Sequence, residues 1–192
     1  MEYSYATVSR LIPKMLADGT LKLNSAAYVP VDPKNKSGVG RYLVYQHSNP
    51  PFSIWAFAFS EGQKTSIHDH KFKGTVTVLE GPISEKKYTP TSDKTAEIVS
   101  QADRHQFHAA RDDLEDKNLT VHQLKLRKNL REPGAVSVTL HIYDMPAKQI
   151  LQSEGGLEVD NRNLLHIFSK SKPSTNKQKP PYEQQHRNSA NK

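Results

Sequence analysis

The segment at residues 136–143 (VSVTLHIY) alternates apolar and polar residues more sharply than any other part of the chain. Successive side chains of a β-strand point to opposite faces, so this segment predicts a strand with one apolar face and one polar face. The polar face is a row of hydroxyl, imidazole and phenol groups: Ser137, Thr139, His141 and Tyr143. The inner face of a small barrel is normally filled by aliphatic side chains, so this row indicates a polar pocket. The alternative is a strand whose polar face simply meets water.

Short apolar runs separated by turns continue through most of the chain. Residues 52–59 (FSIWAFAF) are apolar on both faces and predict a buried central strand. The run TVTVLE alternates and closes on Gly81, which predicts a half-buried strand leading into a hairpin. Further strands are expected at residues 41–46, 85–88, 97–100, 106–109, 119–126 and 164–168. Many short strands, tight turns and little helix predict an all-β sandwich or barrel.

The N-terminal segment is the exception to this pattern. Residues 5–16 place apolar side chains near helical spacing, and Ala17-Asp18-Gly19 supplies a C-terminal stop. Pro13 interrupts the run, because proline has no backbone N–H to donate within a helix. We therefore predict two short helices within residues 4–18, with Pro13 near the first turn of the second.

The net charge of +7 is concentrated at the C-terminal end of the chain. Residues 170–192 carry six basic residues and one acidic residue, which account for +5 of the total. This segment has little to bury, so we expect a disordered basic tail at 170–192 after a single domain at 1–169. The small remaining charge gives little reason to expect a domain that binds nucleic acid.

The chain contains no cysteine, which excludes disulfides, thiolate metal ligands and cysteine nucleophiles. Its N-terminus lacks a basic leader followed by an apolar core, and no apolar run is long enough to cross a membrane. We therefore expect a soluble, cytoplasmic monomer with no membrane partner.

His68 and His70 are separated by one residue, so on an extended strand both imidazoles leave the same face and could reach one metal. The apolar strand before them and the turn after them favour a metal site at the mouth of a barrel over two surface histidines. A pair alone binds metal weakly, so a third ligand should come from another strand. The candidates are His105, His108, His122 and His141. Neutral imidazoles in a facial arrangement suit Fe(II), with Zn, Ni, Cu and Mn as competitors.

The stretch GQKTSIHDHKFKGTVTVLEG resembles the first metal motif of the cupins, and more narrowly that of the cysteine dioxygenase family of thiol dioxygenases. The resemblance continues from about residue 41 to 170 through GRYLVYQ, LTVHQL, AVSVTLHIY and LLHIFSK. It implies a cupin-type β-barrel (jelly roll) at about residues 41–169. The general cupin motif has Glu four residues after the second His, where Gly74 stands here. Three neutral imidazoles would leave a ferrous centre with its full positive charge, which favours an anionic thiolate ligand.

The resemblance also implies which histidines hold Fe(2+). The implied ligands are His68, His70 and His122. In the family the third histidine lies about forty residues beyond the glycine that closes the first motif, and His122 lies 41 residues after Gly81. His108, at 27 residues, is the fallback, and His105 is expected to be a loop residue.

A second family motif is a Ser-x-His-x-Tyr run, in which Tyr sits beside the iron while His and Ser orient it. Thr139, His141 and Tyr143 occupy these positions, so a hydroxyl is retained with an added methyl. Arg41 matches the arginine that holds the substrate carboxylate in members selective for cysteine. Gly74 stands where animal members carry a Cys that crosslinks to the Tyr, so Tyr143 is expected to be unmodified, as in bacterial members.

The resemblance implies a mononuclear non-haem iron enzyme that oxidises L-cysteine with O2 to cysteine sulfinate. One alternative is a dioxygenase of another small thiol such as 3-mercaptopropionate, whose enzymes commonly carry Gln at the position of Arg41. Another is a non-catalytic cupin that binds a metal or small ligand. A third, contact between the basic tail and nucleic acid, ranks below both.

Overall fold

The computed structural model describes residues 3–31, 39–70, 72–104, 106–108, 121–127, 134–150 and 164–170. Within these ranges, side chains are described except at 69–70, 104, 106–108 and 164–169. The described helices are α1 (Tyr5–Ala17), the 3-10 turn η1 (Ser25–Ala27) and α2 (Ala147–Ile150). The other regular elements described are strands, which confirms the all-β prediction. No helix in these ranges is both long and apolar enough to cross a membrane.

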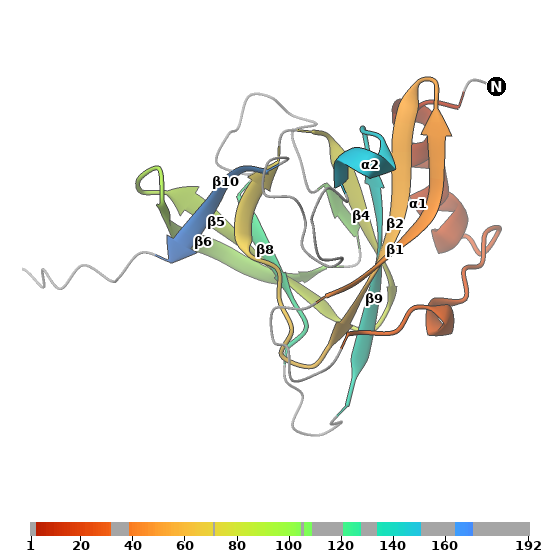
Figure 1. The fold of residues 1–192 in the computed structure, drawn as a ribbon. Helices are drawn as coiled ribbons and strands as arrows, with labels where there is room; N and C mark the ends of the chain where they lie inside the picture. Colours follow the sequence, from red (N-terminus) through yellow and green to blue (C-terminus); the bar gives the residue numbers. More distant parts are fainter. Residues whose placement is uncertain are drawn as a thin grey trace, which may run out of the picture.

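The strands form two groups of five on opposite sides of the molecule (Figure 1). The first sheet runs in the order β1 (Gly40–Ser48), β2 (Pro51–Ser60), β9 (Val136–Tyr143), β4 (Gly74–Glu80) and β7 (Gln106–His108). The second sheet closes on itself in the order β10 (Leu164–Lys170), β3 (Ile67–His70), β8 (His122–Lys125), β5 (Ile83–Pro90) and β6 (Thr95–Arg104). All of these pairings are antiparallel except the parallel contact between β10 and β6. The site described below is built from both sheets.

Strand β9 has the bounds that its alternation predicts. Its apolar residues Leu140 and Ile142 pack with Tyr5 and Val8 of α1, and Phe52 and Ile54 of β2 complete this cluster. Its polar face is buried as well, because Ser137, Thr139, His141 and Tyr143 are each at most 5% exposed. The polar face therefore does not meet water, and the helix covers the apolar one.

The prediction of two short N-terminal helices is wrong. Helix α1 is continuous from Tyr5 to Ala17 with Pro13 inside it, and the Ser4 side chain accepts a hydrogen bond from the Thr7 N–H at its start. Tyr5 and Val8, with Ile12 and Leu16 one and two turns further on, pack as one stripe against the first sheet. Burial of the whole stripe offsets the backbone hydrogen bond that Pro13 cannot donate.

The predicted hairpin at Gly81 is also wrong. Strand β4 pairs with β9 and β7 in the first sheet, whereas β5 pairs with β8 and β6 in the second. The chain therefore crosses from one sheet to the other at this turn, where Gly81 has a φ of +69°. Alternation and a turn glycine predict a strand end, but they do not specify which strand pairs next.

The remaining strand predictions each overlap an observed strand. Residues 52–59 lie in β2, which is buried between β1 and β9. The expected strands at 41–46, 85–88, 97–100, 106–109, 119–126 and 164–168 overlap β1, β5, β6, β7, β8 and β10. The expected tail beyond Lys170 lies outside the described residues, so its disorder and the domain boundary stay predictions.

Candidate metal centre

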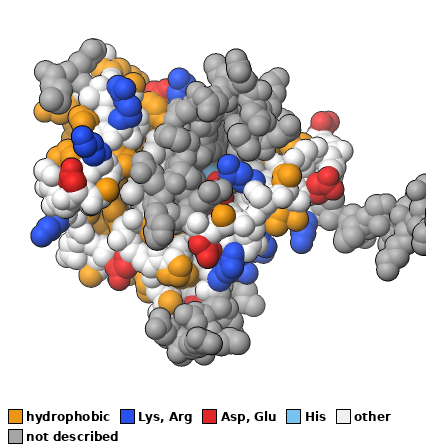
Figure 2. Space-filling view, turned by 180° about the vertical axis from the view of Figure 1, so that it is seen from behind, with side chains coloured by type: hydrophobic (Ala, Val, Ile, Leu, Met, Phe, Trp, Pro, Cys, Tyr) orange, Lys and Arg blue, Asp and Glu red, His pale blue; other side chains and the backbone are white. Residues whose placement is uncertain are grey.

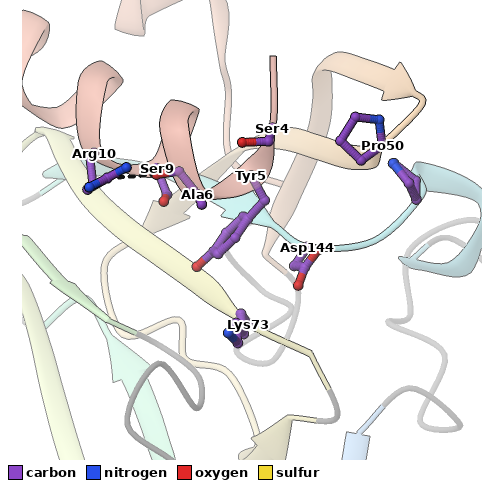
Figure 3. A pocket seen from close by; sticks show the side chains of 9 residues that line it. Ser4, Tyr5, Ala6, Ser9, Arg10, Pro50, Lys73 and Asp144 are labelled. Carbon is purple, nitrogen blue, oxygen red and sulfur yellow. Dashed lines mark hydrogen bonds between the residues drawn. The ribbon is translucent and has the colours of Figure 1, made fainter. Parts of the chain in front are cut away.

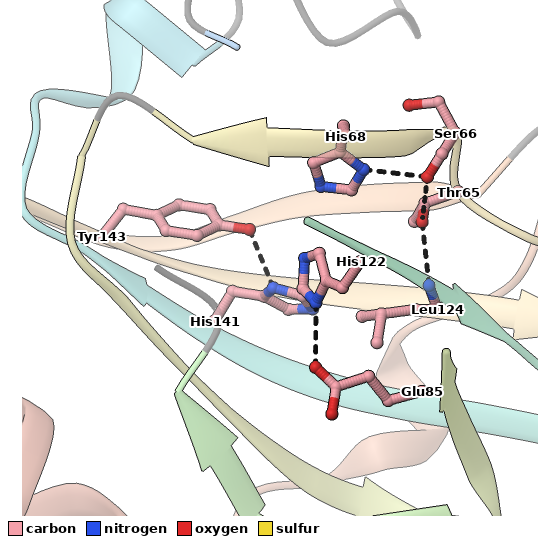
Figure 4. A network of polar contacts seen from close by, with 8 residues as sticks. All are labelled: Thr65, Ser66, His68, Glu85, His122, Leu124, His141 and Tyr143. Carbon is pink, nitrogen blue, oxygen red and sulfur yellow. Dashed lines mark hydrogen bonds and ion pairs between the residues drawn. The ribbon is translucent and has the colours of Figure 1, made fainter. Parts of the chain in front are cut away.

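His68 and His122 come from adjacent strands of the second sheet. They are direct partners in the antiparallel register of β3 and β8, so their side chains leave the same face at the same level. Both residues are buried, and their ring centres lie 4.9 Å apart in an edge-to-face arrangement (Figure 4). The structure thus brings together two histidines that are 54 residues apart in the sequence.

The hydrogen bonds of the two rings show which nitrogen of each ring the protein itself engages. The Nδ1–H of His68 donates to the carbonyl oxygen of Ser66 at 2.9 Å, and the Nδ1–H of His122 donates to Oε1 of Glu85 at 3.1 Å. The Nδ1 atom of each ring is therefore engaged within the protein, so Nε2 is the nitrogen through which either ring would bind a metal. Burial, with a smaller effect from His122, lowers the pKa of His68 to about 3. A neutral imidazole is the form that ligates divalent metals, so this donor set fits Fe(II).

The other predicted histidine ligands are only partly placed. His70 lies on β3 opposite Leu164 of β10, and its side chain is outside the described part of the chain. His108 ends β7 in the first sheet, opposite Thr75, and its side chain is likewise not described. His105 lies outside the described residues.

The segment before β3 is fastened to β8 beside His122. The Thr65 N–H donates to Leu124 O at 2.9 Å, and the Leu124 N–H donates to Thr65 Oγ1 at 3.0 Å. The Gln123 side chain adds a bond from Nε2 to Thr65 O at 2.9 Å. These contacts fix the register that sets His68 opposite His122.

Strand β9 supplies a second polar group to the same interior. His141 lies between Thr139 and Tyr143, with 2.8 Å from its Nε2 to Thr139 Oγ1 and 2.8 Å from its Nδ1 to the Tyr143 hydroxyl. Phe57 of β2 stacks on the imidazole at a ring-centre distance of 3.9 Å. Because a spacing of two keeps all three side chains on one strand face, the contacts form a continuous relay. The extra methyl of Thr139 does not disturb the hydrogen bond.

Burial keeps this relay uncharged at neutral pH. It lowers the pKa of His141 well below its usual value, with smaller effects from His122 and Arg41. It also raises the pKa of Tyr143 far above its usual value, although the charge of Arg41 opposes this shift. The phenol is therefore protonated and the imidazole neutral.

Arg41 reaches the same interior from β1. It is the register partner of Phe57, and its guanidinium carbon lies 5.5 Å from the centre of the Phe57 ring. Its charge acts on His68 as well as on His141 and Tyr143. The predicted substrate-binding arginine thus lies within electrostatic reach of the histidines and the relay.

Gly74 is the register partner of Tyr143 on the neighbouring strand β4. A Cβ atom at position 74 would lie 2.8 Å from Cδ1 of the Tyr143 ring, closer than real carbon contacts. The phenol ring therefore occupies the space that any larger residue would need, and glycine permits its observed position.

Glu85 is a site residue that the sequence reasoning missed. It lies on β5, is 1% exposed and holds the Nδ1 side of His122 (Figure 4). A signal was present, because Glu85 is two residues from the fully buried Ile83 and therefore shares its face of the strand. An acidic residue at an inward position of a strand is unusual, since buried carboxylates need compensating partners.

A separate cavity of about 590 Å³ lies at the start of α1 (Figure 3). Its polar lining includes Ser9, Arg10, Lys73 and Asp144. None of the predicted site residues lines it. Of the described side chains in Figure 2, basic ones are interspersed with acidic and apolar ones.

Solved structures that are similar to this chain at low sequence identity include several cupins. A cupin 2 domain-containing protein from Halorhodospira halophila is 19% identical, with 57% of this chain and 66% of that chain covered and a TM-score of 0.37. A cupin 2 conserved barrel domain protein from Rhodopseudomonas palustris is 14% identical, with 72% and 83% covered and a TM-score of 0.40. An RmlC-like cupin from Desulfovibrio desulfuricans is 20% identical, with 65% and 97% covered and a TM-score of 0.39. No curated protein matches the chain in sequence.

The family comparison covers more than half of the chain. The family described as Cysteine dioxygenase type I matches residues 20–154. This range includes β3, β8 and β9, which carry the paired histidines and the relay. The predicted resemblance is confirmed: the chain belongs to the cysteine dioxygenase type I family of cupin dioxygenases.

Proposed function

We propose that this protein is a mononuclear non-haem iron thiol dioxygenase that adds both atoms of O2 to the sulfur of L-cysteine, giving cysteine sulfinate. The observation that carries the proposal is the pairing of His68 and His122 on adjacent strands, with both Nδ1 atoms engaged by protein oxygens. Membership of the cysteine dioxygenase type I family supports it independently.

The residues proposed to hold the metal are His68, His70 and His122. When bound, Fe(II) would supply the binding position for the substrate thiolate and the electrons that activate dioxygen. A set of three neutral imidazoles brings no negative charge into direct contact with the metal, which favours an anionic substrate. Gly74, which stands at the place of the general cupin glutamate, is consistent with this set.

The remaining site residues would bind and orient the substrate. The Arg41 guanidinium can grip a carboxylate through two parallel hydrogen bonds, which suits an amino acid substrate. The protonated Tyr143 hydroxyl is held in place by His141, which is held in turn by Thr139. Phe57 stacks on His141 and lies under the guanidinium, so it fixes the arginine and the relay relative to each other.

The direct test is oxygen uptake by the iron-loaded protein with L-cysteine, followed by mass spectrometry of the product formed in labelled O2. We expect cysteine sulfinate containing two labelled oxygen atoms. A protein that holds iron but consumes no oxygen with any small thiol would overturn the proposal.

The choice of thiol is tested by Arg41→Gln with two substrates. We expect this variant to lose far more activity with L-cysteine than with 3-mercaptopropionate, because family members that use 3-mercaptopropionate commonly carry Gln at this position. Both thiols have a carboxylate, so equal losses would contradict a role of Arg41 in selecting L-cysteine over 3-mercaptopropionate. A higher kcat/KM of the unmodified protein for 3-mercaptopropionate would instead identify that thiol as the substrate.

A further inference from the structure

The two paired histidines differ in the group that holds their Nδ1 atom. His68 donates to a neutral backbone carbonyl, that of Ser66, at 2.9 Å. His122 donates to a carboxylate oxygen of Glu85 at 3.1 Å. The side chains of Glu85 and His122 are only 1% and 3% exposed, so water does not screen this contact. The two histidines are therefore held by groups of different chemistry, a backbone carbonyl on one side and a carboxyl group on the other.

The position of Glu85 excludes it as a direct ligand through this contact. Its Oε1 atom accepts a hydrogen bond from Nδ1 of His122, whereas a metal held by this residue would bind Nε2, on the opposite edge of the ring. The carboxylate therefore sits behind the imidazole. A hydrogen-bonded carboxylate raises the basicity of a ligating imidazole and fixes its orientation.

A buried carboxylate is costly unless other groups compensate its charge. Strands β5 and β8 are paired along this stretch, with Glu85 opposite Leu124 and Lys87 opposite His122, so the fold holds the carboxylate against the ring. A divalent cation on the far side of His122 would add attraction over a short distance through a region of low dielectric constant. A cation held by His122 would therefore also stabilise the buried Glu85 carboxylate.

We propose that Glu85 is a positioning residue that serves as the outer-sphere negative charge of the metal centre and acts through His122. This inference rests on the proposed function, since it presumes that the histidines hold iron. It also accounts for Gly74 at the position of the general cupin carboxylate: the negative charge of this site is supplied from β5 instead, one imidazole away from the metal. Three neutral ligands and one remote carboxylate leave the metal attractive to a thiolate while strengthening its attachment to the protein.

The test compares Glu85→Gln with the unmodified protein by titration with Fe(II) against a competing chelator. Gln has nearly the same shape and keeps an acceptor oxygen for His122, but it lacks the charge. We expect Glu85→Gln to weaken Fe(II) binding by roughly 10- to 100-fold. The matched control is Glu97→Gln, which removes an exposed carboxylate on neighbouring strand β6 and should leave the affinity unchanged.

Two further measurements separate a charge effect from a structural one. The Fe(III)/Fe(II) potential should rise in Glu85→Gln, because a nearby negative charge stabilises the ferric state. The rise in unfolding temperature on addition of Fe(II) should be smaller in the variant, whichever way the metal-free protein is affected. Glu85→Asp retains the charge on a shorter side chain, so its potential and its stabilisation by Fe(II) should lie between those of Glu85→Gln and the unmodified protein. It also serves as the second variant where Glu85→Gln folds poorly.

The outcomes for the two proposals are distinguishable. Unchanged iron affinity and potential in a folded Glu85→Gln protein would overturn the role of Glu85 and leave the proposed function standing. An unmodified protein that binds iron, but loses affinity on Glu85→Gln and oxidises no thiol, would overturn the function and support the role of Glu85. A protein that does not bind Fe(II) would overturn both.

Discussion

The two sheets contribute different kinds of side chain to the same interior. The second sheet supplies His68 and His122, each with its Nδ1 atom engaged by a protein oxygen. The first sheet supplies Arg41 and the relay that ends at Tyr143, in which Thr139 and Tyr143 engage both nitrogens of His141. The comparison teaches that metal binding and substrate handling are separated by sheet, so variants in the two sheets should fail in different ways.

Removal of a ligand from the second sheet has the largest expected effect. His122→Ala should abolish thiol oxidation and weaken Fe(II) binding by more than about 100-fold, the upper range for an outer-sphere change. Iron content after loading and oxygen uptake with L-cysteine measure the two losses. The control is His47→Ala, which removes a partly exposed imidazole of β1 and should affect neither. A His122→Ala protein that still holds iron and oxidises thiol would contradict the assignment of metal binding to the second sheet.

A change in the relay of the first sheet should spare the metal. Tyr143→Phe removes only the hydroxyl that His141 holds, so iron affinity should stay within about twofold. The kcat for L-cysteine should fall by about 100-fold, in the range of positioned proton donors and acceptors. Thr139→Val, which removes the far end of the relay, should cause a smaller fall, of about tenfold. The control is Tyr45→Phe, which removes an exposed hydroxyl of β1 and should change neither kcat nor iron affinity. Loss of iron from Tyr143→Phe would contradict the assignment of metal binding to the second sheet alone.

Local pattern predicted most of this architecture from the sequence. The alternation at 136–143 gave β9 its bounds and its two faces, because strand periodicity is a property of the backbone. It did not predict the crossing at Gly81 or the unbroken helix through Pro13, since both depend on packing against distant strands. Long-range partners are decided by the whole core and are not encoded in any single segment.

The site residues divide in the same way into those that local spacing predicts and those that depend on the pairing of distant strands. His68 and the relay residues were found because their spacing places them on one strand face, and His122 because the family resemblance fixes its distance from Gly81. Glu85 was missed, because its importance arises only when β5 pairs with β8 and brings the carboxylate to His122. The roles of His70 and of the whole ligand set stay predictions.

The packing of the Tyr143 ring against Gly74 gives a further test of the role of the first sheet. Gly74→Ala places a Cβ atom 2.8 Å from Cδ1 of the phenol ring, so the ring or the strand must move. We expect a loss of about 1–3 kcal/mol in the free energy of unfolding, as for overpacked cores, with a fall in kcat and little change in iron affinity. Chemical denaturation measures the stability. The cost should largely disappear in a Tyr143→Ala background, and an equal cost in both backgrounds would locate the strain elsewhere.

The last comparison is between one buried imidazole from each sheet in the metal-free protein. The pKa of His68 falls to about 3 and that of His141 falls well below its usual value, so in the folded state both stay neutral while the unfolded chain takes up protons below about pH 6.5. The unfolded state then binds more protons, and stability must decrease as the pH falls from 6.5 to 4.5. Each histidine lowers the free energy of unfolding by up to about 1.4 kcal/mol for each pH unit of this fall. Denaturation of the metal-free protein across this range should show a steep dependence of stability on pH, which is reduced by His68→Gln and by His141→Gln. A dependence that only one of the two variants reduces would show that the sheets do not bury their histidines equally.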